Sequence, residues 1–219
     1  MLTNILKMTH YSLGIIQTWE RFYRANFINS LSGYKSASLI GTCNLAGQTN
    51  LAIFSNIVHL GADPALVAFI NRPLAAAPHT IANILATKQF TINHIPQQLV
   101  QQAHQTSAKY DATVSEFDAT HLTPIYKGNC IAPFVEECTI QYSLNLVEVV
   151  PIIHNNTSMV IGAVQDVYVI TDYIEKDGFI AIEKADSIAS LGIDGYYACQ
   201  RVARLAYAQV GIESKVLSK

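Results

Sequence analysis

The sequence predicts a mainly β fold with short helices, built from antiparallel strands and most easily closed as a barrel. Polar and apolar residues alternate with a period of two through most of the first two thirds of the chain, and turn-forming residues separate the alternating stretches. Helical periodicity is confined to short segments. No linker, low-complexity tract or internal repeat interrupts the 219 residues, so we expect a single domain, 1–219, with an N-terminal extension over about residues 1–23.

The strands are expected to pair as antiparallel hairpins. The clearest alternation, over 139–146, should pair with the β-branched run that follows the turn-rich segment 151–158. A second hairpin should form across the turn residues Asn44 and Gly47. The expected strand segments are 36–43, 48–58, 65–70, 90–94, 139–146 and 159–170.

Three short helices are expected between and after these strands. Thr80 is positioned to be the N-cap of the first, which contains Ile81 and Ile84. The second covers about 97–108. The third is the C-terminal helix, over about 196–210, whose apolar residues fall on one face.

Composition limits the class of protein. Hydrophobic residues make up 50% of the chain and charged residues 14%, compared with roughly 25% charged residues in an ordinary soluble domain. The excess of hydrophobic residues must therefore be buried in a full core or in a subunit interface. The net charge of −2 gives no attraction to nucleic acid, and no stretch reaches the roughly 18 apolar residues of a membrane-spanning helix. Without a recognisable signal peptide, we expect a cytoplasmic protein that binds neither nucleic acid nor membrane.

Common catalytic and metal-binding motifs are absent from the sequence. It contains no dinucleotide-binding glycine fingerprint, phosphate-binding P-loop, nucleophile elbow or H-E-x-x-H. The seven histidines do not fall at ligand spacing, so no metal site is expected. The four cysteines, Cys43, Cys130, Cys138 and Cys199, include no C-x-x-C pair, and we expect them to be buried free thiols.

The strongest local signal is an anion-binding pattern. Asn71-Arg72-Pro73 ends a strand, and Pro78-His79-Thr80 begins a helix shortly afterwards. A helix N-terminus offers unpaired N–H groups, Arg72 can donate two hydrogen bonds to a phosphate, and Thr80 adds a hydroxyl. Alternatively, Thr80 only caps its helix and Arg72 is a solvated loop residue.

Polar residues interrupt the apolar strand 49–58 at Asn50, Ser55 and Asn56. Polar side chains in a buried strand need partners, and the edge of a flat heteroaromatic ligand lying on the strand would supply them. The alternative is a strand with one solvated face and a bend near Ser55.

Two other segments contain residues able to contact a ligand. The segment 192–197 combines a pair of glycines, which allow close approach to the backbone, with tyrosines that can stack on a ring. Alternatively, it is a loop leading into a surface helix that carries Arg201 and Arg204. The hydroxyl residues in 104–107 end an expected helix and are taken to cap or turn, so no site is assigned there.

Four segments in order along the chain carry a family resemblance: "FINSLSGYKSASLIGT", "GQTNLAIFSNIVHLGADPALVAFINRP", "HTIANILATKQFTINHI" and "AHQTSAKYDATVSEFDATHLTP". Together they resemble the flavin reductase-like, FMN-binding split-barrel family, and most nearly its flavoredoxin-like branch. The resemblance covers about residues 24–123 and continues more loosely through "SLGIDGYYACQRVARL". It implies an antiparallel split barrel, usually a homodimer, with FMN near the subunit interface.

The resemblance also implies where FMN binds. In such proteins the strand that matches 50–56 lies along the isoalloxazine, and the positions that match Arg72 and Thr80 face the phosphate. The segment 30–36 and the pair Asn93-His94 are placed near the cofactor. The implied cofactor-binding residues are Asn50, Ala52, Phe54, Ser55, Asn56, Asn71, Arg72, His79, Thr80 and Asn83.

The implied function is that of an NAD(P)H:flavin oxidoreductase. It would transfer hydride or electrons from NADH or NADPH, or from a redox partner, through FMN. Because FMN itself performs this chemistry, no residue is assigned as a catalytic acid or base. The alternatives are a flavin-binding protein without turnover, an electron carrier for a monooxygenase, and an interaction module without a ligand.

Overall fold

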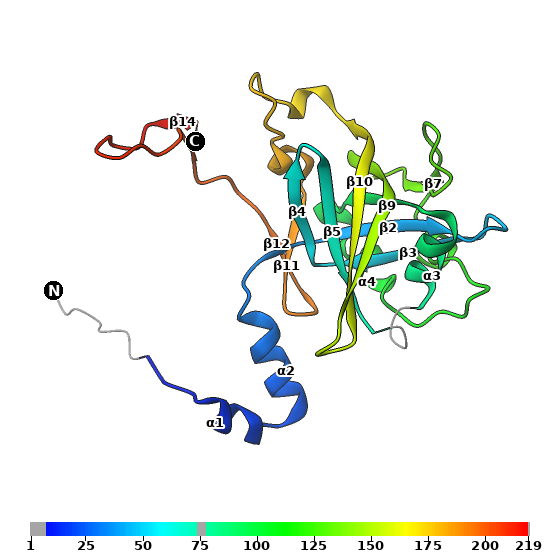
Figure 1. Ribbon diagram of the computed structural model, residues 1–219, viewed down its shortest axis with the longest axis horizontal. Coiled ribbons are helices and arrows are strands. Elements are labelled where there is room, and N and C mark those ends of the chain that lie inside the picture. The colour runs from blue at the N-terminus through cyan, green and yellow to red at the C-terminus, as the bar shows by residue number, and fades with distance from the viewer. Residues whose placement is uncertain (1–7, 74–77, 219) are drawn as a thin grey trace.

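The computed structural model describes residues 8–73 and 78–218, and within them a seven-stranded antiparallel sheet dominates (Figure 1). The strand order is β3-β2-β6-β9-β10-β5-β4. The strands are β2 (Ser38–Cys43), β3 (Thr49–Phe54), β4 (Ile57–Ala62), β5 (Ala65–Asn71), β6 (Gln89–His94), β9 (Ile140–Ile152) and β10 (Thr157–Val169).

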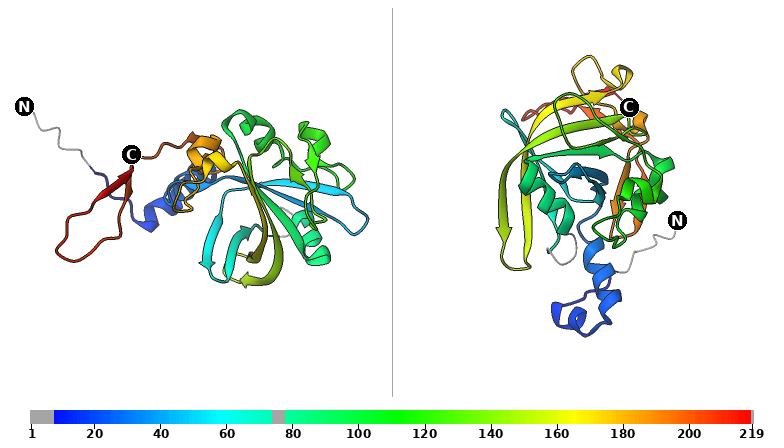
Figure 2. Two further views of the ribbon diagram at one scale, coloured as in Figure 1. Left: turned by 90° about the horizontal axis from the view of Figure 1, so that it is seen from above. Right: turned by 90° about the vertical axis from the view of Figure 1, so that its right-hand side faces the viewer.

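The order of the strands shows how the sheet becomes a split barrel. Strands β3 and β4 lie at opposite edges of the sheet, yet only Ser55 and Asn56 separate them in the chain. The sheet must therefore curl until its two edges approach each other, as the end-on view of Figure 2 shows. Because β3 and β4 do not pair, the curled sheet stays open between them. The predicted antiparallel barrel is confirmed, with its split at the bend that the sequence placed near Ser55.

Smaller elements complete the described chain. The remaining strands are β1 (Lys35–Ser36), β11 (Ile188–Leu191) and β12 (Gly195–Ala198) in one sheet, β7 (Pro124–Ile125) with β8 (Phe134–Val135), and β13 (Arg204–Leu205) with β14 (Val216–Ser218). The α-helices are α1 (Leu13–Thr18), α2 (Arg21–Ser30), α3 (Pro78–Thr87), α4 (Val100–Gln105) and α5 (Glu116–Thr120). The 3₁₀ turns are η1 (Gln97–Leu99), η2 (Thr171–Tyr173) and η3 (Ile182–Ala185).

The two predicted hairpins are present. Strands β2 and β3 pair from Cys43 opposite Thr49, across a turn in which the Asn44 side chain accepts the backbone N–H groups of Ala46 and Gln48. Strands β9 and β10 pair along almost their whole length. Side-chain alternation and short-range turn chemistry are enough to specify these pairings.

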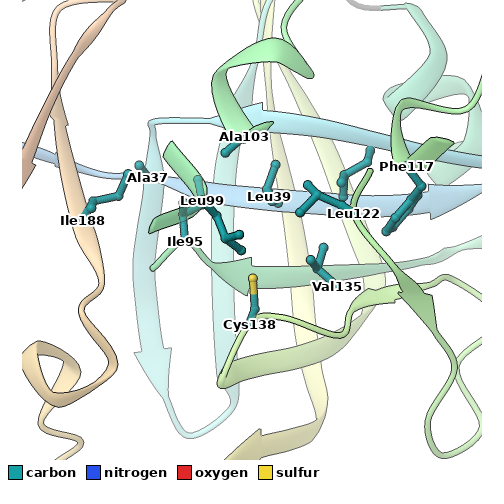
Figure 3. Packing of buried hydrophobic residues seen from close by; sticks show 11 residues of the cluster. Ala37, Leu39, Ile95, Leu99, Ala103, Phe117, Leu122, Val135, Cys138 and Ile188 are labelled. Atoms are coloured by element: carbon teal, nitrogen blue, oxygen red, sulfur yellow. The ribbon is translucent and has the colours of Figure 1, made fainter. Parts of the chain in front are cut away.

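The core lies on both faces of the sheet, and neighbouring residues of β2 supply both halves. Leu39 packs with Leu51, Phe117 and other residues under α4 and α5 (Figure 3). Ile40 points the other way and packs with Phe69 and the residues of α3. All six residues of β2 are buried, because the sheet is covered on both sides here.

Three sequence predictions are wrong in this part of the molecule. The C-terminal helix expected over 196–210 is absent: residues 195–198 form strand β12 and an extended segment follows. Thr80 is not an N-cap, because α3 begins two residues earlier at Pro78, whose fixed φ suits the first helical position. All four thiols are free, but Cys199 is exposed and not buried.

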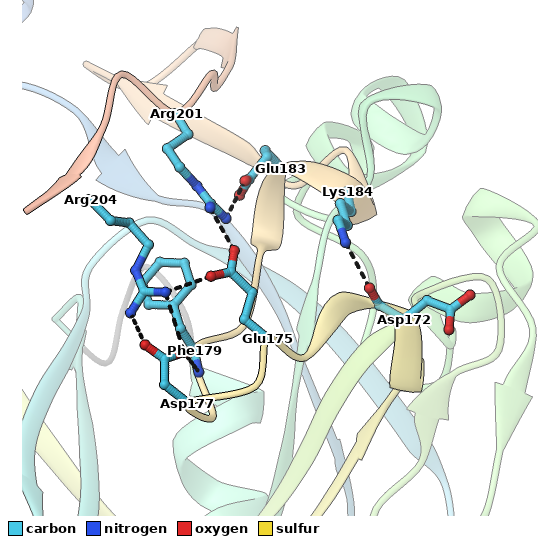
Figure 4. A network of polar contacts seen from close by, with 8 residues as sticks. All are labelled: Asp172, Glu175, Asp177, Phe179, Glu183, Lys184, Arg201 and Arg204. Carbon is cyan, nitrogen blue, oxygen red and sulfur yellow. Dashed lines mark hydrogen bonds and ion pairs between the residues drawn. The ribbon is translucent and has the colours of Figure 1, made fainter. Parts of the chain in front are cut away.

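Charge pairing explains why the C-terminal segment is extended and not helical. The Arg201 guanidinium pairs with Glu175 and Glu183, and the Arg204 guanidinium pairs with Glu175 and Asp177 (Figure 4). Both guanidinium groups also lie over the ring of Phe179. These hydrogen bonds hold the pKa of the Glu175 and Asp177 carboxyls below their usual range. Tertiary ion pairs have overridden the local helical pattern.

The described part of the N-terminal segment, residues 8–30, contains α1 and α2, and α2 runs to Ser30, past the end of the extension expected over about residues 1–23. Four of its aromatic rings, those of Tyr11, Trp19, Tyr23 and Phe27, pack edge to face. Figure 2 shows these helices and the β13–β14 hairpin projecting from the barrel. In the part of the chain described, no helix has the length and apolar character needed to cross a membrane.

Candidate functional site

A cavity of about 860 Å³ lies beside the split between β3 and β4. Its volume falls within the range of roughly 300–1,000 Å³ that is typical of small-molecule and cofactor sites. Eight of the ten predicted site residues line it: Asn50, Ala52, Phe54, Ser55, Asn56, Arg72, His79 and Thr80. The structure therefore brings the polar strand and the predicted anion site to one place.

The anion end of the cavity is formed by Arg72 and the first turn of α3. Arg72 is exposed, follows β5 directly and has no carboxylate partner among the described residues. Thr80, the third residue of α3, is buried except for a small fraction of its surface. The two residues offer a guanidinium, a hydroxyl and helix N–H groups to the same space, which is the chemistry that binds a phosphate.

A hydrogen-bond network fixes the Thr80 hydroxyl. The Asn50 amide donates to Thr80 Oγ1 and to Thr42 Oγ1, both at 3.1 Å. The Asn83 amide donates to the same Thr42 oxygen at 3.1 Å. Since Thr80 accepts a hydrogen bond from Asn50, its own proton remains available to an acceptor in the cavity.

Strand β3 forms the long wall of the cavity, and side chains take two of its outward N–H groups. The Leu51 N–H donates to Glu116 Oε2 and the Ile53 N–H donates to Thr106 Oγ1, each at 3.0 Å. Burial raises the pKa of Glu116, although the Leu51 N–H opposes this shift. Ser55 is the next residue on this side, and its N–H has no partner among the residues described.

Other lining residues come from segments that are distant in sequence. His104 Nδ1 lies 2.8 Å from the hydroxyl of Tyr196, which joins α4 to β12, and both side chains line the cavity. Burial raises the pKa of Tyr196, and the nearby Asp194 carboxylate adds to the shift. Ser190 also lines the cavity; its hydroxyl oxygen is buried and has no partner among the described residues.

The candidate segment 192–197 contributes lining residues to the cavity, and so does the segment 104–107, to which the sequence analysis assigned no site. His104, Thr106 and Ser107 all line the cavity, although they were expected only to cap or turn. No local pattern could have identified them, because their contacts are with residues far away in the chain. A histidine and two hydroxyl residues at the end of one short helix were the available signal.

Two of the ten predicted site residues, Asn71 and Asn83, do not line this cavity. Asn71 is buried beside the cavity without lining it, and its amide donates to the Arg72 carbonyl at 2.8 Å. Asn83 lines an adjoining cavity of about 140 Å³, which shares Asn50 and His79 with the larger one. The segment 30–36 contributes no lining residue to the large cavity.

Asn93 and His94, which the resemblance placed near the cofactor, do not line the cavity. The Asn93 amide bonds to the Leu39 carbonyl and accepts the Val135 N–H. His94 is half-buried, and its burial lowers its pKa to about 4. Its Nδ1 lies 3.3 Å from Ser187 Oγ. In the structure, both side chains therefore make internal polar contacts and do not reach this cavity.

An open antiparallel barrel, with a cavity lined by Arg72 and the start of α3 beside its split, defines this chain as a split-barrel protein. It belongs to the family described as the flavin reductase like domain, whose family model matches residues 31–182. Within the described part of the chain no group of three or more His, Cys, Asp or Glu side chains could hold a metal ion.

Solved structures support the same assignment. The crystal structure of a candidate flavin reductase with a split barrel domain from Shewanella frigidimarina NCIMB 400 is 48% identical, with a TM-score of 0.89 over 92% of this chain and 100% of that chain. Nitrilotriacetate monooxygenase component B from Bacillus cereus is 20% identical, with a TM-score of 0.79 over 91% of this chain and 99% of that chain. Flavoredoxin of Desulfovibrio vulgaris (Miyazaki F) is 23% identical, with a TM-score of 0.69 over 82% of this chain and 93% of that chain. The last two likenesses show the fold alone.

One curated relative, an uncharacterized protein of Aquifex aeolicus (strain VF5), is 26% identical over 115 residues. The match covers 52% of this chain and 59% of that protein. This chain therefore spans less than two thirds of the length of that relative.

Proposed function

We propose that the chain is an FMN-dependent oxidoreductase of the flavin reductase type, which accepts hydride from NADH or NADPH and passes electrons on. The observation that carries this proposal is the shared cavity: Arg72, the first turn of α3 and the free end of β3 all line it. A phosphate site next to an open strand edge suits a ligand that is anionic at one end and a flat heterocycle at the other.

The residues present fit FMN. Arg72, Thr80 and the helix N–H groups would hold the phosphate. The Ser55 N–H and the buried Ser190 hydroxyl, both without partners among the described residues, offer hydrogen bonds to a polar ring. A buried polar group such as the Ser190 hydroxyl is rarely left unpaired unless a ligand or water satisfies it.

FMN, when bound, supplies the hydride and electron transfer itself. The chain would bind its phosphate and orient its ring along β3. The apolar residues of the wall, among them Ala52, Phe54 and Ile70, would exclude water from the ring. His104 and Tyr196 also line the cavity, and we assign the nicotinamide of the electron donor to their part of it.

A steady-state assay separates this function from that of a non-turnover electron carrier. Purified protein supplied with FMN should oxidise NADH or NADPH at a rate proportional to protein concentration, followed by the loss of reduced-nicotinamide absorbance. Heat-denatured protein with the same FMN is the control. FMN binding without oxidation of either nucleotide would favour the alternative, a carrier for a monooxygenase or another redox partner.

We further propose a homodimer, because large apolar side chains are exposed on both projecting segments. Four such side chains are more than half exposed: Phe22 and Leu31 in the N-terminal segment, and Val202 and Tyr207 in the C-terminal segment. A two-stranded hairpin such as β13–β14 is only marginally stable unless another surface packs against it. Sedimentation equilibrium should give about twice the chain mass of 24.0 kDa; a monomer at all concentrations would contradict this proposal.

A further inference from the structure

We propose that Thr106 and Glu116 are positioning residues, which hold the outer edge of β3 so that only its Ile53–Ser55 end is open to the flavin ring. This inference rests on the proposed function. It assigns to two side chains, neither recognised from the sequence, the task of fixing where the ring lies along the strand. The evidence is the pattern of hydrogen bonds on the side of β3 that faces away from β2.

Strand β3 is an edge strand, paired on one side only, with β2. In an antiparallel pair, backbone groups of alternate residues point toward the partner and away from it. The N–H groups of Leu51 and Ile53 bond to side chains of other elements, so these are the outward residues. An edge of this kind normally exposes a row of unpaired groups. Here side chains replace the missing strand.

Glu116 secures the first part of this edge. It is the first residue of α5, it is buried, and its carboxylate accepts the Leu51 N–H. The preceding residue, Ser115, lies with its hydroxyl 2.6 Å from that of Thr49. Two neighbouring side chains therefore tie the start of α5 to alternate residues of β3.

Thr106 secures the next position, and its orientation is determined. Its hydroxyl donates to the Ala103 carbonyl at 2.7 Å, which closes the end of α4. Since that bond uses the single hydroxyl proton, Thr106 must face Ile53 with a lone pair and can only accept. Thr106 is almost fully buried, so water cannot take its place readily.

Ile53 is the last residue of β3 whose outward N–H group bonds to a side chain. The next outward group is the Ser55 N–H, and the outward carbonyl before it belongs to Ile53. An acceptor beside a donor is complementary to the imide edge of a flavin, in which an N–H lies beside a carbonyl. Glu116 and Thr106 occupy the N–H groups of Leu51 and Ile53. The flavin edge can therefore pair with β3 in one position, at the Ile53 carbonyl and the Ser55 N–H.

The test compares Thr106→Val, which keeps the shape but removes the acceptor, with Thr106→Ser, which keeps the hydroxyl. We expect Thr106→Val to weaken FMN binding about tenfold, which corresponds to about 1.4 kcal/mol, and to shift the visible absorption of the bound flavin. Thr106→Ser should stay within about twofold of wild type. Thr113→Val, which removes an exposed hydroxyl outside the cavity, is the matched control.

A second pair of variants covers the case in which Thr106→Val does not fold. Glu116→Gln retains an oxygen that can accept the Leu51 N–H, whereas Glu116→Leu removes it. Flavin affinity and spectrum should change in Glu116→Leu and be largely restored in Glu116→Gln. Urea unfolding without flavin monitors the fold separately.

Two outcomes would overturn the inference, and they differ. If folded Thr106→Val and Glu116→Leu bind FMN with wild-type affinity and spectrum, the positioning role is wrong while the proposed function stands. If wild-type protein binds no FMN, the proposed function is wrong and the inference falls with it.

Discussion

Arg72→Ala is expected to weaken FMN binding by about 1–3 kcal/mol, or roughly fivefold to 150-fold, the range for a hydrogen bond to a charged group. Arg72 lines the cavity beside Thr80 and the N-terminus of α3, and it has no carboxylate partner among the described residues. Removing it should therefore affect the ligand more than the fold. Fluorescence titration of FMN with wild-type and variant protein measures the difference.

Two comparisons make this prediction specific. Arg72→Lys should fall between wild type and Arg72→Ala, because lysine keeps the charge but cannot form a two-pronged contact with phosphate. Arg21→Ala, which removes an arginine on α2 outside the cavity, should leave the FMN affinity unchanged. Equal affinities for wild type and Arg72→Ala would place the phosphate elsewhere.

Phe69→Ala is expected to lower the free energy of unfolding by about 3–5 kcal/mol, the range for deleting a buried aromatic side chain. The Phe69 ring is completely buried, with its centroid 4.8 Å from that of Phe54 and 5.7 Å from that of Phe90. These contacts join β5 to β3 and β6 in one half of the core. The space left by the missing ring should loosen β3 and β5, the two strands that end at the candidate site.

Urea denaturation measures this effect, and Leu45→Ala provides the control. Leu45 is 80% exposed in the turn between β2 and β3, so its removal should change the stability of the barrel very little. A loss of less than about 1 kcal/mol in Phe69→Ala would show that the packing around β5 is looser than described.

The strands could be predicted because their signals are local. The alternation around Tyr142 and the turn at Asn44 each specify a hairpin within a short stretch of chain. The cavity wall on β3 could be identified for the same reason, since Asn50 and Ser55 interrupt an apolar run. Arg72 and Thr80 were recognised because a strand end and a helix start lie close together in the sequence.

The extended C-terminal segment and the other cavity residues could not be predicted, because they depend on contacts between residues that are distant in the sequence. Val202 and Leu205 have helical spacing, but the carboxylates that hold Arg201 and Arg204 lie on a separate loop and keep the segment extended. His104 meets Tyr196 from 92 positions away, and Glu116 reaches Leu51 from 65 positions away. Residues of these types could equally cap a helix or face solvent, so sequence spacing alone could not assign them to the cavity.

The most direct test of an FMN site beside the barrel split is a titration of the purified wild-type protein with FMN, followed by absorbance and flavin fluorescence. The expected result is saturable binding of one FMN per chain, with a perturbed flavin spectrum and release of FMN on denaturation. A folded protein that shows no saturable FMN binding, and whose preparation is colourless, would contradict the assignment of this cavity to a flavin.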